Sequence, residues 1–284
     1  MKKKYILHSP HIEQLKKKKR KVFRNRIIFF GICFLIIFTG LIFLSRWQKL
    51  NIENIQISGN KVIETNDIEN LVRSDLAGKY LWVFPKTNFV LYPKSKINRD
   101  LENTFKRFSD ISINLDTFKT LNIAVIERDG KYLWCGIDPS LISQCYFMDQ
   151  VGYIFDESPY FSGDVYFKFY GKNGENSLNP TGAYFLKDQF ESLVTFKNDI
   201  AEMNLKPTAF WIDQNGAGNI SLGGDPALAP KIIFKLDADY GKLAENLQAT
   251  ITTEPLATKL KTNFPSLLYL DLRFGNNVYY KFKQ

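Results

Sequence analysis

Histidine is almost absent from this sequence, and its placement excludes several kinds of catalytic site. The only two histidines, His8 and His11, precede a long apolar run, so the chain from residue 47 onward contains none. A Ser–His–Asp or Cys–His mechanism and a zinc site with histidine ligands are therefore excluded from that part. A serine–lysine pair or paired carboxylates need no histidine, but no spacing favours either. We expect no catalytic residue, no metal and no cofactor.

Cysteine is also scarce. Cys33 lies within the apolar run, and Cys135 and Cys145 lie beyond it, without the C-x-x-C spacing of a redox motif. On adjacent predicted strands, the second pair would form a structural disulfide in an oxidising compartment. Two small, partly buried thiols are the alternative, and the sequence leaves both open.

An excess of charge of one sign is lacking outside the first 26 residues. Of the 38 basic and 29 acidic residues, 11 basic and 1 acidic lie in residues 1–26, which leaves 27 and 28 for the rest. This balance excludes a basic surface for nucleic acid beyond the tail, and nothing indicates a small-molecule substrate. The basic tail fits attraction to anionic lipid.

One long hydrophobic run is present, over residues 27–44, and reads IIFFGICFLIIFTGLIFL. As a helix it would be about 27 Å long, close to the hydrocarbon thickness of a bilayer. The basic residues before it predict a cytoplasmic tail over 1–26, a membrane helix over 27–45 and an extracytoplasmic remainder. A cleaved signal peptide is the alternative, but Ser45, Arg46 and Trp47 offer no small-residue cleavage site.

Residues 50–129 follow a β-α-α-β-β pattern. Alternation predicts a strand over 52–58, and 3.6-residue periodicity predicts a helix over 64–76, with Thr65 or Asn66 as N-cap. A second helix follows Pro93, its apolar face running from residue 97 to 108, before strands around 111–115 and 121–128. Aromatic segment 80–84 is either packing between the two helices, which we favour, or an exposed docking patch. The charged pair Glu127-Arg128 is either a binding site or a pair of solvent-side charges that end a strand, and we favour the second.

Residues 130–284 are rich in strands. Turn residues separate the predicted strands, which cover 132–135, 145–148, 152–155, 165–170, 208–212, 219–222, 231–236, 267–274 and 278–283. Two helices, around 184–203 and 240–250, interrupt them, and polar segment 171–181 is expected to be an exposed loop. The fold class is therefore α+β.

Five motifs occur in the order known from one family. They are I-Q-I-S-G-N at 55–60, L-N-I-A-V-I-E-R at 121–128, D-Q-V-G-Y-I-F at 149–155, I-S-L-G at 220–223 with Lys231, and Y-L-D-L-R-F at 269–274. Behind a single membrane helix, this order resembles the FtsQ/DivIB family of bacterial cell-division proteins. The resemblance implies a POTRA domain over 50–129 and a β domain over 130–284.

The resemblance also implies a scaffold at the division septum of the cell membrane. Such proteins recruit coiled-coil proteins of the FtsB/FtsL type, and β-strand addition to the C-terminal sheet edge is the expected route. On the family's motifs the partner contacts fall on Phe274 and Tyr280, with Arg273 adjacent. The expected partner-binding residues are Arg273, Phe274, Val278, Tyr279, Tyr280 and Phe282.

Two other interpretations stay open. Phe274 shares its strand parity with Leu270 and Leu272, so it is equally well a core residue, as is Phe282. At the level of function, the alternatives are a peptidoglycan-acting enzyme using two of Asp149, Asp156 and Asp213, and a POTRA-type envelope chaperone.

Overall fold

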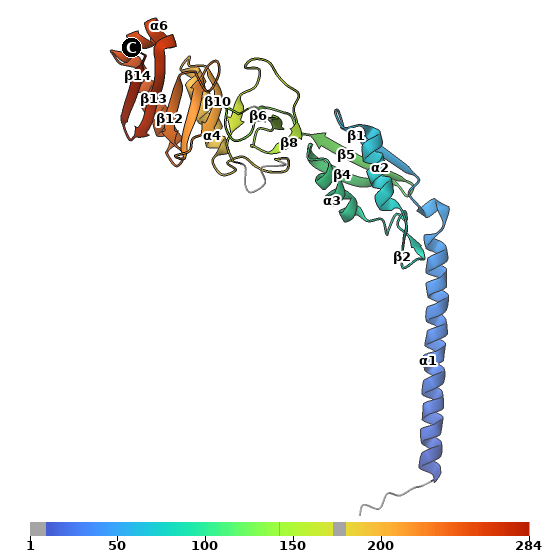
Figure 1. Ribbon diagram of the computed structural model, residues 1–284. Helices are drawn as coiled ribbons and strands as arrows, with labels where there is room; N and C mark the ends of the chain where they lie inside the picture. Colours follow the sequence, from blue (N-terminus) through green and yellow to red (C-terminus); the bar gives the residue numbers. More distant parts are fainter. Residues whose placement is uncertain (1–9, 142, 173–179, 284) are drawn as a thin grey trace, which may run out of the picture. The chain divides into compact units, whose positions relative to one another are not determined.

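The computed structural model describes residues 10–141, 143–172 and 180–283, and its contacts divide the chain into two units (Figure 1). Unit 1 comprises the residues up to 104 together with 110–126, and unit 2 comprises 105–109 together with the residues from 127 onward. Both contain helices and sheets, so the α+β class is confirmed. The domain limits expected from the sequence, 50–129 and 130–284, stay predictions.

Helix α1 (Pro10–Ser45) contains the apolar run. Its portion from Lys18 to Ser45 is long and apolar enough to cross a membrane. Most of its apolar side chains are exposed, as expected for a helix whose natural surroundings are lipid. A short 3-10 helix, η1 (Gln48–Leu50), follows.

A three-stranded sheet forms the base of unit 1, in the order β1 (Asn54–Ser58), β5 (Thr120–Glu127), β4 (Phe108–Thr117), with β1 parallel to β5. Helices α2 (Thr65–Leu76) and α3 (Lys94–Thr104) contact each other, and α2 contacts β1. Their apolar faces bury Ile68, Val72, Ile97 and Leu101, and β5 buries Leu121 and Ile123. The β-α-α-β-β pattern is thus present, with one insertion.

Two helix details differ from the sequence expectation. The N-cap of α2 is Glu64, whose side chain makes no capping hydrogen bond, rather than Thr65 or Asn66. Helix α3 ends at Thr104, because Phe108 is already the buried first residue of β4. The helical spacing of apolar residues from 97 to 108 therefore spans both α3 and the first residue of β4.

The insertion is a small hairpin, β2 (Lys79–Tyr80) and β3 (Phe84–Pro85). The preference for core packing of segment 80–84 was wrong at its tip: Leu81 and Trp82 are 79% and 91% exposed. The turn directs both side chains away from the helices, because Leu81 and Trp82 adopt positive φ angles of 46° and 67°.

Unit 2 is built on a nine-stranded sheet in the order β14-β13-β12-β11-β10-β9-β6-β7-β8. The strands are β6 (Tyr132–Trp134), β7 (Tyr146–Met148), β8 (Ile154–Glu157), β9 (Lys168–Tyr170), β10 (Pro207–Ile212), β11 (Ala217–Leu222), β12 (Lys231–Lys235), β13 (Leu267–Phe274) and β14 (Asn277–Phe282). The strands expected from the sequence are all present, several of them shorter than expected. Most of segment 171–181 lies outside the described residues.

Helices α4 (Phe190–Glu202) and α5 (Tyr240–Thr252) lie where two helices were expected, and α6 (Leu256–Asn263) is an addition. These helices pack on one face of the sheet. The core there is largely aromatic and includes Phe169, Phe196, Phe210 and Phe234, all fully buried. The opposite face carries the alternate residues of each strand, such as Asn219 and Asp271.

The two edges of this sheet differ. Beyond β8, residues 182–185 run alongside residues 152–154 of the chain. Ile154 N–H donates to the Ala183 carbonyl at 2.9 Å, and Gly182 N–H donates to the Ile154 carbonyl at 2.7 Å. The edge at β8 is therefore partly covered, whereas β14 has a described neighbour on one side alone, β13.

Candidate partner-binding edge

Strand β14 forms the outer edge of the sheet and pairs antiparallel with β13. Beyond its end, Lys283 N–H donates to the Ser266 carbonyl at 2.7 Å, and so points toward β13. Both register shifts of this pair fall on the β13 side, so β14 keeps its regular alternation. The N–H groups of Val278, Tyr280 and Phe282 therefore point outward, available to another strand.

The side chains of Val278, Tyr280 and Phe282 lie on the helix-bearing face. All three pack, half-buried, against the core, and the Lys259 ammonium of α6 lies 6.0 Å from the Tyr280 ring and 5.9 Å from the Phe282 ring. The core interpretation of Phe282 thus holds in part. These rings end at the sheet edge, where an added strand would extend the apolar layer.

Phe274 and Tyr279 form an exposed aromatic pair. Phe274 is 54% and Tyr279 55% exposed, and their ring centroids lie 5.1 Å apart in an edge-to-face arrangement. The parity argument that placed Phe274 in the core was wrong, because the register with β14 shifts between Asp271 and Phe274. Such an irregularity re-aims the side chain, while Leu270 and Leu272 stay buried.

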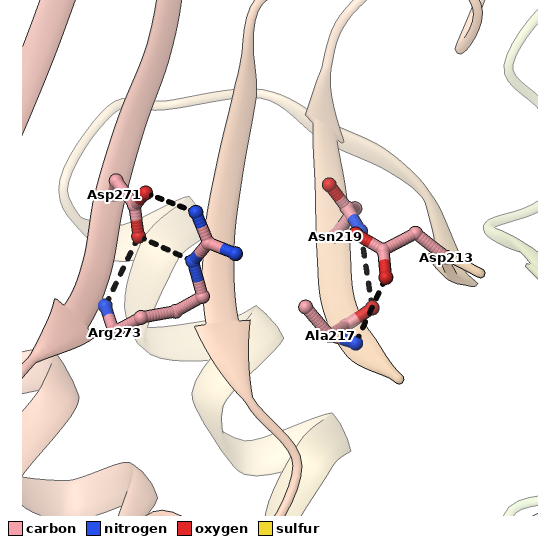
Figure 2. Close-up of polar contacts among 5 residues, drawn as sticks. All are labelled: Asp213, Ala217, Asn219, Asp271 and Arg273. Carbon is pink, nitrogen blue, oxygen red and sulfur yellow. Dashed lines mark hydrogen bonds and ion pairs between the residues drawn. The ribbon is translucent and has the colours of Figure 1, made fainter. Parts of the chain in front are cut away.

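The side chain of Arg273 forms an ion pair with Asp271, which lies two residues earlier on β13 (Figure 2). Its Nε donates to Oδ1 at 2.9 Å and its Nη2 to Oδ2 at 2.6 Å, a two-point ion pair with a carboxylate that is 5% exposed. These hydrogen bonds raise the pKa of Arg273 above its ordinary value. The guanidinium also lies 5.8 Å from the Phe274 ring centroid, within the range of a cation–π contact.

A second polar pair lies on the same face, at the turn between β10 and β11 (Figure 2). Asp213 Oδ1 accepts the Ala217 amide at 3.0 Å, and Asp213 Oδ2 accepts the Asn219 side-chain amide at 3.3 Å. Burial raises the pKa of the Asp213 carboxyl, but these hydrogen bonds and the charge of Arg273 outweigh it, so the pKa lies below its ordinary value. Asp213 thus shapes a turn.

The other two carboxylates considered for catalysis also serve local structure. Asp149 accepts the backbone amides of Val151 and Tyr153, both at 3.0 Å, and pairs with Arg128 at 2.6 Å. Asp156 pairs with Arg107 at 2.7 Å. Arg128 is therefore a partner of the hairpin turn and not a solvent-side charge, contrary to expectation.

The sulfur atoms of Cys135 and Cys145 are bonded in the structure. We propose that the bond forms in the cell. In a Cys33→Ser chain trapped with a thiol-alkylating reagent, we expect no labelling of Cys135 or Cys145 until a reductant is added, because an extracytoplasmic compartment is oxidising. Mass spectrometry of the trapped chain checks this. Labelling without reductant would contradict the proposed bond.

A curated relative matches part of the chain. Over 122 residues the chain is 29% identical to the cell division protein DivIB of Listeria monocytogenes, and the match covers 43% of this chain and 44% of that protein. The match thus spans less than half of the relative's length. No protein-family model matches the chain. The relative, the motif order and the membrane-length helix agree, and by all three the chain is similar to bacterial cell-division proteins of the FtsQ/DivIB family.

Proposed function

We propose that this cell-division protein is a non-enzymatic scaffold that recruits FtsB/FtsL-type coiled-coil proteins to the division septum by strand addition to β14. The observation that carries the proposal is the outer edge of β14, which no described strand covers. The residues whose N–H groups point outward there, Val278, Tyr280 and Phe282, also carry the half-buried apolar side chains of the strand. The proposed contacts are those expected from the sequence: Arg273, Phe274, Val278, Tyr279, Tyr280 and Phe282.

The edge suits a strand because it lacks the features that usually block one. Native sheets protect their edges with proline, inward-pointing charges or a bulge on the edge strand itself. Residues 277–282 contain no proline and a single charged residue, Lys281, and the register shifts lie on β13. Main-chain hydrogen bonds to this edge would supply affinity, and the aromatic pair Phe274–Tyr279 would supply specificity on the exposed face.

The proposed topology follows the charge distribution. The basic residues before the apolar run favour a cytoplasmic N-terminus, with the rest of units 1 and 2 outside, at the septal membrane. The proposed partners are single-pass proteins whose coiled coils lie on that same side. POTRA and β-domain limits of 50–129 and 130–284 belong to the same proposal.

Photo-crosslinking in cells tests the recruitment. A photoreactive amino acid at position 280 is expected to capture a short single-pass coiled-coil protein, identified by mass spectrometry. Truncation after Phe274 removes β14 and is expected to abolish the capture from a photoreactive residue at position 274, a proposed contact that the truncated chain retains. No such partner, together with a normal septum in the truncated strain, would contradict strand addition at β14.

A further inference from the structure

The tip of the β2–β3 hairpin, which we call the apolar tip, consists of Leu81 and Trp82. Neither the core nor the proposed partner edge uses it. The two side chains are among the most exposed large apolar groups outside α1, at 79% and 91%. An exposed tryptophan beside an exposed leucine marks a contact surface.

The hairpin is fixed to the end of α1. The hairpin lies beside the end of α1 (Figure 1). The Arg46 guanidinium donates from Nε to the Val83 carbonyl at 3.1 Å, and the Phe84 ring lies 5.9 Å from the Phe38 ring. Phe38 lies six residues before Leu44, the end of the apolar run, which places it about 9 Å inside that run. The hairpin therefore contacts α1 within the apolar run and not only at the end of that run.

The segments that surround the hairpin are held at the same helix end. Asn88, a buried residue, donates its side-chain amide to the Ser45 carbonyl at 3.2 Å, and Phe89 N–H donates to the Leu50 carbonyl at 3.0 Å. The neighbouring Val90 is 69% exposed, and Trp47 at the start of η1 is 55% exposed. Exposed apolar groups thus gather around the point where α1 ends.

The backbone of the apolar tip does not favour these residue types. Both residues have positive φ in the three-residue loop 81–83, a region that asparagine and glycine adopt with little cost. Bulky side chains at such positions destabilise the turn. The stability of the hairpin therefore does not explain leucine and tryptophan at these positions. A contact with something outside the chain would explain them.

We propose that Leu81 and Trp82 insert into the headgroup–acyl boundary of the bilayer that α1 spans. This second contact would fix the tilt of unit 1 on the membrane. Tryptophan prefers this depth because its ring is apolar and its N–H can reach water or lipid carbonyls. Lys79 is the first residue of the hairpin and Lys86 directly follows it, where their ammonium groups suit lipid phosphates. The inference rests on α1 being a membrane span.

Tryptophan quenching by brominated lipid tests the proposal in the full chain. The chain is reconstituted in vesicles of phosphatidylcholine and phosphatidylglycerol with bromine at shallow or deep acyl carbons. A Trp47→Phe chain is compared with a Trp47→Phe, Trp82→Phe chain, so that the difference reports Trp82. The matched control adds Val62→Trp to the double variant, because Val62 follows the opposite end of β1 and is 61% exposed.

We expect the Trp82 signal to lose most of its intensity with shallow bromines and less with deep ones, while the indole introduced at position 62 of the control is unaffected. A Trp82 signal as insensitive as the control, in chains that resist carbonate extraction, would overturn the proposal and assign the apolar tip to a protein partner. Chains released by carbonate would overturn it for a different reason, since α1 would then not span the membrane.

Discussion

Replacing Tyr280 by proline is expected to weaken partner binding about 10- to 100-fold, because an added strand loses a main-chain hydrogen bond and meets the proline ring. The N–H of Tyr280 points away from β13, as the Lys283–Ser266 hydrogen bond indicates. Proline at this position removes no bond within the sheet. The fold of unit 2 is therefore expected to survive, whereas proline at 279 would break the pairing with Asp271.

Tyr280→Ala is the matched control for this experiment. It removes the ring but keeps the outward N–H, so strand addition predicts a smaller loss than for proline. The coiled-coil partner captured in cells supplies the ligand, and titration of that ligand against the full chain in detergent supplies the affinities. Equal losses for alanine and proline would assign the binding to the Tyr280 side chain and remove the strand model.

Asp149→Ala is expected to destabilise unit 2 by about 3–5 kcal/mol, since it leaves a largely buried arginine without its counter-charge. The side chains of Arg128 and Asp149 are 18% and 9% exposed, and Arg128 lies 4.2 Å from the Tyr153 ring centroid. The same substitution frees the two backbone amides of the turn that Asp149 accepts. The variant therefore loses both the ion pair with Arg128 and the hydrogen bonds that stabilise the turn.

Urea unfolding of the full chain in detergent measures this loss. In a Trp47→Phe, Trp82→Phe background, Trp134 and Trp211 remain, and both belong to unit 2. A midpoint lower by about 2 M is expected for Asp149→Ala. Asp149→Asn keeps an oxygen for the turn amides and is expected to lose less. An unchanged midpoint for the alanine variant would show that the Arg128–Asp149 pair contributes nothing net.

Periodicity predicted the elements that bury one face against a neighbour. Helix α2 and strand β5 were recognisable because their apolar residues repeat at the helical and strand periods. The β2–β3 hairpin was not, since strands of two residues are too short to show a period. Its position depends on contacts with α1 at Arg46 and Phe38, which no local pattern encodes.

The sequence predicted the strands that carry the candidate site, but not which of their side chains are exposed. Family motifs placed attention on Phe274 and Tyr280, and the structure puts both on the last hairpin of the sheet. The exposure of Phe274 depends on a register shift, which alternation along one strand cannot reveal. Arg128 was misassigned for a similar reason, because its partner Asp149 lies 21 residues away.

The covering of β8 by residues 182–185 limits how this sheet can grow. A sheet with two open edges can accept a strand at one side and donate a strand at the other, and so assemble into a fibre of identical copies. Because residues 182–185 cover the start of the β8 edge, a second copy has less of that edge to pair with than it has at β14. On the proposed function, each chain would then accept a partner strand at β14 in preference to β8, so crowding at a septum would favour occupancy of β14 over polymerisation.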